Sequence, residues 1–117
     1  MKSLASIGPK DIDIIKMALN DAISDINTEL KSSLSEKQRM EILDYKTKYV
    51  RVYDKLRQNP SIYSLAEHEL DIAAGGLNDA IELLEEYAAD DLDEQEKEDI
   101  SSYKDECQKL IDLLASS

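Results

Sequence analysis

Residues 61–89, SIYSLAEHELDIAAGGLNDAIELLEEYAA, decide how many helices this chain forms. Apolar side chains recur there at the three- and four-residue spacing of one helix face: Ala66, Leu70, Ala73, Ala74, Leu77, Ala80, Ile81, Leu84 and Ala88. Their phase is unchanged across Gly75-Gly76, although a glycine costs a helix interior about 1 kcal/mol relative to alanine. We therefore predict one helix over 61–89. The alternative is a stop at Gly75, with Gly76 or Asn78 capping a new helix.

Three further segments, residues 9–33, 36–58 and 94–115, show the same helical period. Each follows a helix-start signal: Gly8 before Pro9, Ser35 with Gln38 in a capping-box pattern, and Asp93 with Glu96. Asn59-Pro60 ends the segment 36–58, because a residue before proline is pushed out of the helical region. The sequence therefore predicts four helices.

The links between these helices are short, so consecutive helices should be antiparallel neighbours. Gly 3 and Pro 2 are too few for the turns of an all-β fold. We expect an all-α, up-down-up-down four-helix bundle, formed by one domain over residues 1–117, with residues 1–8 as a short N-terminal arm.

Several function classes are disfavoured by what the chain contains. One cysteine, Cys107, fits a reducing compartment, and no apolar run approaches the ~18 residues of a membrane span. We therefore expect a cytoplasmic protein with no membrane contact. A single histidine, no phosphate-binding glycine motif and no calcium-loop pattern lead us to expect no metal, no cofactor and no enzymatic activity.

The charge is unevenly distributed along the chain. The formal net charge is -12. Residues 1–60 carry 11 basic and 9 acidic side chains, whereas residues 61–117 carry 3 and 17. Such an acidic half repels nucleic-acid phosphates and attracts a basic protein surface. We expect a small acidic protein-interaction module of the adaptor, chaperone-like or inhibitor (immunity) type. The alternative is that these charges only keep the protein soluble.

The outer face of the helix over 61–89 is the predicted binding surface. It carries a second apolar stripe, a possible notch at two glycines, and acidic side chains nearby: Leu65, Ile72, Leu83 and Tyr87, then Gly75 and Gly76, then Glu82, Glu86 and Asp90. We expect a partner protein to bind there. The alternatives are a homo-oligomer seam, or coverage by a neighbouring helix or by the N-terminal arm.

His68 should point to solvent, away from the core stripe. The pattern His68-Glu69-Leu70, followed by Gly76-Leu77, resembles histidine-containing phosphotransfer domains, which are four-helix bundles with an exposed phospho-accepting histidine. That resemblance implies His68 as the phospho-acceptor. It departs from the family at Asp71, where the family has lysine, and at Ile72, where it has glycine. Glu67, Glu69 and Asp71 would also repel a phosphoryl group. Phosphotransfer is therefore the alternative function.

Three tyrosines, Tyr45, Tyr49 and Tyr53, share one face of the helix over 36–58. We expect them at the rim of the bundle with their hydroxyl groups in water. The alternative is a tyrosine-rich surface that contributes to partner binding.

Overall fold

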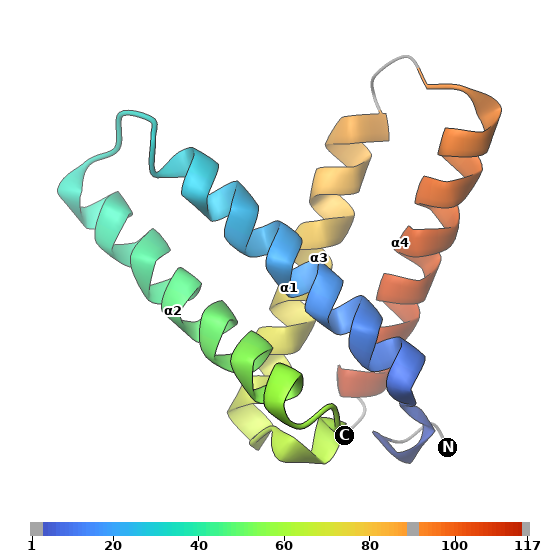
Figure 1. Ribbon diagram of the computed structural model, residues 1–117. Coiled ribbons are helices and arrows are strands. Elements are labelled where there is room, and N and C mark those ends of the chain that lie inside the picture. Colours follow the sequence, from blue (N-terminus) through green and yellow to red (C-terminus); the bar gives the residue numbers. More distant parts are fainter. Residues whose placement is uncertain (1–3, 89–91, 116–117) are drawn as a thin grey trace.

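The structure is a computed structural model that describes residues 4–88 and 92–115. Its four α-helices are α1 Pro9–Glu29, α2 Glu36–Gln58, α3 Glu67–Ala88 and α4 Glu94–Ala115 (Figure 1). Two short 3-10 turns, η1 Leu4–Ser6 and η2 Ile62–Ser64, precede α1 and α3. The predicted all-α four-helix bundle is confirmed, and α2 and α4 have the predicted limits. None of the helices in the described part is long and apolar enough to cross a membrane.

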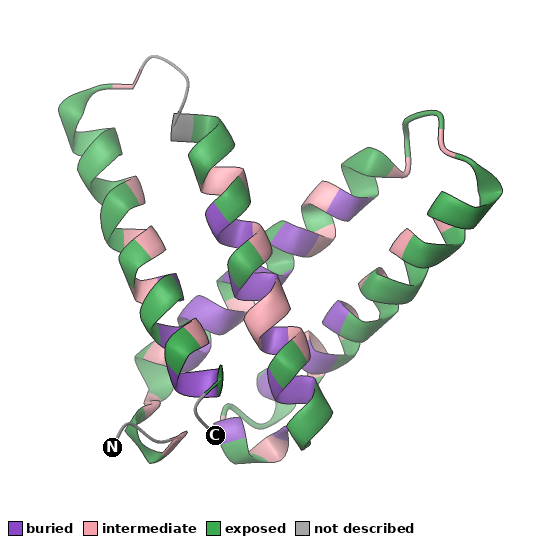
Figure 2. Ribbon diagram, turned by 180° about the vertical axis from the view of Figure 1, so that it is seen from behind, coloured by how far each residue is buried: buried purple, intermediate pink, exposed green. Residues whose placement is uncertain are grey.

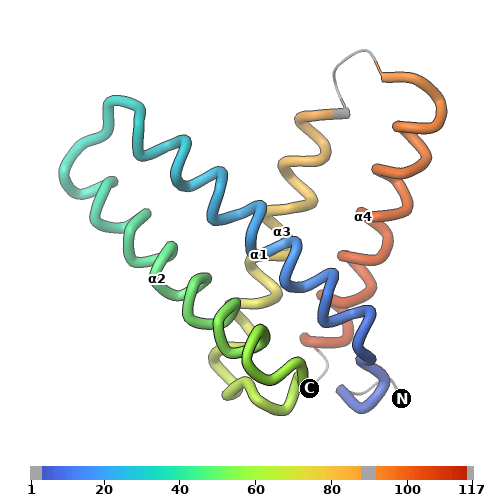
Figure 3. The backbone as a smooth tube through the Cα atoms, viewed as in Figure 1, coloured from blue at the N-terminus to red at the C-terminus, as the bar shows by residue number. Residues whose placement is uncertain are grey.

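The helices form two antiparallel hairpins, α1–α2 and α3–α4. Helix α1 packs across α3, and α2 also contacts α3. Beyond this crossing the hairpins diverge towards their connecting loops (Figures 1 and 3). The result is a flat molecule with principal extents of 44 × 37 × 23 Å.

The hydrophobic core lies at the crossing of the hairpins, where the buried segments gather (Figure 2). Its most deeply buried large side chains come from all four helices: Ile12, Ile15, Leu19, Val52, Leu56, Leu77 and Cys107. The far ends of the hairpins contribute little. On α2 only Tyr49, Val52 and Leu56 are buried, although its apolar arc is wider. The core therefore holds the hairpins together at one end and leaves them apart at the other.

The three predicted helix starts are confirmed by hydrogen bonds. Ser35 and Gln38 exchange reciprocal bonds, each 3.1 Å long, between side chain and backbone N–H. The Glu96 N–H donates to Asp93 at 2.8 Å. At α1, Pro9 takes the first helical position, and the Gly8 N–H donates to Asp11 at 3.1 Å.

Helix α1 ends at Glu29, four residues before the predicted end at residue 33. The Ser32 hydroxyl donates to the Glu29 carbonyl at 2.6 Å. The Arg39 guanidinium, from α2, donates to the Leu30 carbonyl at 3.1 Å. These side chains satisfy carbonyls that another helical turn would have used, so the chain turns early.

Helix α3 begins at Glu67 and not at residue 61, so the predicted start is wrong. Ser61 accepts from the Tyr63 N–H and starts the turn η2 instead. This turn lets Ile62 and Leu65 both reach the core, where they are 3% and 8% exposed. Ile62 and Leu65 do not both fit the apolar stripe of α3. Their burial therefore favours the turn η2 over an earlier start of the helix.

The prediction of a helix that continues through Gly75 and Gly76 is confirmed, because α3 runs unbroken from Glu67 to Ala88. Neither glycine has a positive φ. A Cβ atom on Gly76 would lie 2.6 Å from Leu19 Cδ2. A side chain at residue 76 would therefore collide with the side chain of Leu19 on α1.

Stability should fall on the alkaline side, because three core groups must stay neutral. Burial raises the pKa of the Cys107 thiol from its ordinary 9.0 to about 11, and burial also raises the pKa of Tyr49 and Tyr103. An acidic group whose pKa is higher in the folded than in the unfolded protein stabilises the fold. This stabilisation is complete below the pKa of the unfolded protein and is lost as the pH rises through the pKa of the folded protein. We therefore expect urea titrations to give a falling unfolding free energy between pH 9 and about 11.

Cys107→Ala is the matched variant for this alkaline effect. Between these pH values the unfolding free energy of this variant should fall less steeply than that of wild type. The slopes should differ by about 1.4 kcal/mol per pH unit, which is the contribution of one titrating proton. An unchanged slope would show that the buried thiol takes no part.

Candidate functional site

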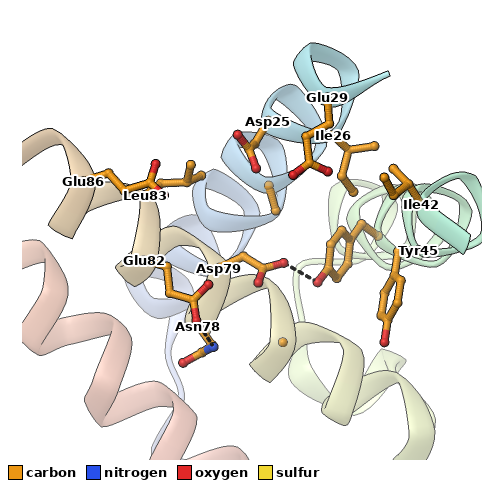
Figure 4. Close-up of a pocket in the computed structure, with 13 residues that line it drawn as sticks. Asp25, Ile26, Glu29, Ile42, Tyr45, Asn78, Asp79, Glu82, Leu83 and Glu86 are labelled. Atoms are coloured by element: carbon orange, nitrogen blue, oxygen red, sulfur yellow. Dashed lines mark hydrogen bonds between the residues drawn. The ribbon is translucent and has the colours of Figure 1, made fainter. Parts of the chain in front are cut away.

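A groove of about 480 Å³ lies where α1 and α3 separate beyond the crossing (Figure 4). We call it the fork groove. Three helices line it: Ala22, Asp25, Ile26 and Glu29 of α1; Ile42, Tyr45 and Tyr49 of α2; and Gly75, Asn78, Asp79, Glu82, Leu83 and Glu86 of α3.

The charge of the fork groove has one sign. Five of its lining side chains are carboxylates, and none is lysine, arginine or histidine: Asp25, Glu29, Asp79, Glu82 and Glu86. Within residues 4–88 and 92–115, none of these five forms an ion pair. The charge of the groove therefore favours a cationic ligand.

The floor of the groove is apolar. Ile26 is buried there, and Ile42 and Leu83 are half-buried. These side chains, with Ala22, come from three helices, and Leu83 lies on the α3 side of the groove, across from Ile26 and Ile42 on the α1–α2 side (Figure 4). An apolar floor between acidic walls suits a ligand with one apolar face and cationic flanks.

Tyr49 ties α2 to α3 beside this floor. Its hydroxyl donates to Asp79 at 2.6 Å, the dashed bond between these two helices in Figure 4. Tyr49 is 4% exposed, so the expectation of a hydroxyl in water is wrong at this residue. Burial, followed by the bond to Asp79, raises its pKa. Tyr45 is exposed as expected, with the Lys48 Nζ 5.4 Å from its ring centroid.

A second hollow, of about 380 Å³, adjoins the fork groove and also lies between α1 and α3. Its lining includes Asp21 and Tyr87, and it shares Asp25 and Leu83 with the fork groove. Burial raises the pKa of Asp21. No basic side chain is in the lining of either hollow, so the acidic surface continues across the fork.

The structure brings five of the nine predicted partner-binding residues to these hollows. Gly75, Glu82, Leu83 and Glu86 line the fork groove. Tyr87 lines the second hollow and is 54% exposed. Whether a partner binds there stays a prediction.

Two other predicted positions are corrected by the structure. Leu65 lies before α3 and is buried in the core, so it cannot belong to an exposed stripe. The notch at Gly76 is filled by Leu19 of this chain. Ile72 is half-buried against the core and lies outside both hollows, and its part in a binding surface stays a prediction. A ninth predicted residue, Asp90, lies outside the described residues.

His68 is exposed, as predicted, in the first turn of α3. Glu67 and Asp71 beside it are also exposed, whereas Glu69 is buried and bonded to Lys55. His68 precedes the first fork-groove residue of α3 by two helical turns. Its use as a phospho-acceptor stays a prediction. Among the described residues, no group of three His, Cys, Asp or Glu side chains could hold a metal ion.

Of the residues of α1 and α2 that line the groove, Tyr45 and Tyr49 were predicted only in the alternative of a tyrosine-rich binding surface, and the others were not predicted. Asp25 and Glu29 lie one turn apart beside the apolar Ala22 and Ile26. That pattern is also typical of an ordinary solvated helix edge, so it contains no signal of its own. Asp25 and Glu29 line a groove only because α3 lies opposite α1. The helical period of the sequence does not specify which helix lies opposite another.

Comparisons with known protein families, with characterised proteins and with solved structures find no match to this chain.

Proposed function

We propose that this protein is an interaction module that binds a basic partner protein in the fork groove and acts by binding, not by catalysis. The observation that carries the proposal is a groove with an apolar floor, five carboxylates and no basic lining residue. Apolar contacts would supply most of the affinity, and the carboxylates would set the encounter rate and the choice of partner.

The charges of the groove favour a cationic ligand for a simple reason. A basic ligand can pair with carboxylates that form no ion pair within the described residues. The same negative charge would repel the phosphate groups of nucleic acids and of anionic lipids. Salt should weaken the interaction and slow the encounter.

The three classes expected from the sequence, adaptor, chaperone-like protein and inhibitor, all suit such a groove. They differ in what the basic partner does once it is bound. We place the interaction in the cytoplasm, since a buried free thiol such as Cys107 suits a reducing compartment.

Charge reversal in the groove tests this function. Glu82→Lys with Glu86→Lys should weaken binding of the physiological partner by about 100-fold or more, because two attractive contacts become repulsive. The matched control is Glu98→Lys with Asp105→Lys on α4, which makes the same charge change at exposed residues outside both hollows. Affinity capture at low and high salt, followed by calorimetry with the purified partner, provides the measurement.

Two results would contradict the proposal. One is the same set of proteins retained by wild type, groove variant and control, and the other is no protein retained by any of them. Sedimentation velocity over a concentration range tests whether the protein binds a second copy of itself. Concentration-dependent self-association that the groove variant abolishes would make a second copy the occupant, in place of a different protein.

A further inference from the structure

We infer that the fork groove accepts one amphipathic α-helix of the partner, with an apolar stripe facing Ile26, Ile42 and Leu83 and with lysine or arginine on both flanks. This inference rests on the proposed function and names the conformation and chemistry of the occupant. The bound segment would lie between the two hairpins as a fifth helix.

The first support is the shape of the site. Its walls are α1 and α3, two helices that are in contact at their crossing and then diverge (Figure 1). Ile26 and Leu83 each lie seven residues, about two turns, beyond the contact of Leu19 with Gly76 at the crossing, and carboxylates of α1 and α3 lie on both sides of them along the helices (Figure 4). A helix with one apolar stripe matches a wedge, because it buries a single narrow face and keeps two polar flanks at the walls.

The second support is the spacing of the carboxylates. On α3, Asp79, Glu82 and Glu86 follow the i, i+3, i+7 pattern, which places them about 4.5 and 10.5 Å along the axis from the first. A ligand helix beside α3 repeats its cations at the same intervals. An extended strand repeats one face about every 6.7 Å and loses register by the third residue.

The third support is that both walls carry carboxylates, three on α3 and two on α1. Asp25 and Glu29 of α1 are one turn apart and face the groove. An extended segment can reach both walls only with alternate side chains, which leaves it no separate apolar face. A helix presents cations on two flanks about its apolar stripe and can pair with both walls.

Defined peptides test the inference. The helical probe is an alanine-based peptide of about 14 residues, four turns, with leucines in one stripe and lysines on both flanks. One control has the same composition with the leucines spread around the helix, and a second has a central proline. The measurements are dissociation constants by calorimetry, helicity by circular dichroism and mapping by amide chemical shifts.

The helical probe should bind about tenfold or more tighter than either control, gain helicity when bound and shift the amides of Ile26, Ile42 and Leu83. Leu83→Asn should weaken its binding by about tenfold, since it removes an apolar contact of the floor. Leu43→Asn is the matched control, because Leu43 is a 42% exposed leucine on α2 outside both hollows.

The possible failures are distinguishable. Equal affinity for all three peptides, with loss in Glu82→Lys/Glu86→Lys, would overturn the helix and leave the basic-partner function standing. Equal affinity of that variant and wild type for every peptide would overturn both. Shifts confined to residues outside the fork groove, or no binding of the helical probe, would also overturn the helical occupant.

Discussion

Lys55→Met is expected to destabilise the protein by about 2–3 kcal/mol at neutral pH, because it leaves a buried carboxylate without its cation. Glu69 is 1% exposed. It accepts from the Lys55 Nζ at 2.6 Å and from the Ala66 N–H at 2.8 Å, so it links α2 to the start of α3. For a domain of this size the loss corresponds to a fall of roughly 10 °C in Tm.

The pH dependence should change sign in this variant. Burial alone would raise the pKa of Glu69, but the bonds from Lys55 and Ala66 and the positive charges outweigh it and hold the pKa below its ordinary 4.5. In wild type this stabilisation is present above pH 4.5 and is lost as pH falls through the lowered pKa. Without Lys55 the effect of burial dominates, the pKa of Glu69 rises, and acidification from neutral pH stabilises the variant.

Lys48→Met is the matched control. Lys48 lies on the same helix, has a side-chain exposure of 48% against 44% for Lys55, and pairs with the exposed Asp44 at 3.2 Å. A surface pair of this kind contributes about 0.5 kcal/mol or less. Urea titrations of both variants between pH 4 and pH 8 measure the difference. Equal destabilisation by the two variants, or parallel pH profiles, would contradict the role assigned to the buried Glu69.

Gly75→Ala and Gly76→Ala are expected to change stability in opposite directions although the residues are adjacent in one helix. Alanine at either position gains up to about 1 kcal/mol of helix propensity. At Gly75 the new Cβ would lie 3.5 Å from the Tyr49 hydroxyl, an ordinary contact, so the gain is kept. At Gly76 it would lie 2.6 Å from Leu19 Cδ2 and 3.8 Å from Leu19 Cα. Leu19 is fully buried in the core and cannot move aside freely.

Overpacking of this kind costs about 1–3 kcal/mol. The propensity gain is common to both variants, so Gly76→Ala should be less stable than Gly75→Ala by about 1–3 kcal/mol. Thermal unfolding of the two variants, followed by circular dichroism, gives the comparison directly. A Gly76→Ala protein as stable as Gly75→Ala would show that the Leu19 side chain, or α1 itself, can shift at little cost. The contact of Leu19 with Gly76 would then not fix how closely α1 and α3 pack.

The local elements were predictable because their signals lie within a few residues of each other. The capping pair Ser35 and Gln38, and the stop at Asn59, mark both ends of α2 without reference to the rest of the chain. The two wrong helix limits have distant causes. Arg39 of the next helix bonds the end of α1, and the core takes Ile62 and Leu65 out of the helical phase before α3.

Four of the thirteen residues that line the fork groove were predicted partner-binding residues, and all four lie on α3. Glu82, Leu83 and Glu86 belong to the segment whose outer face had already been singled out. Asp25 and Glu29 of α1 and Tyr49 of α2 lie 30 or more residues away from Asp79 or Glu86 in the chain. Such residues become neighbours only through the packing of one hairpin on the other.

The sequence by itself determined the four helices, their order and the face that each one buries. It also determined that acidic side chains are frequent on α3. These properties follow from hydrophobic period, capping residues and composition, which act locally along the chain. Only the tertiary structure decided that the hairpins cross and diverge. The direction of one helix axis against another depends on close contacts such as Leu19 against Gly76. That divergence leaves the fork groove open and places carboxylates of α1 and α3 on its facing walls.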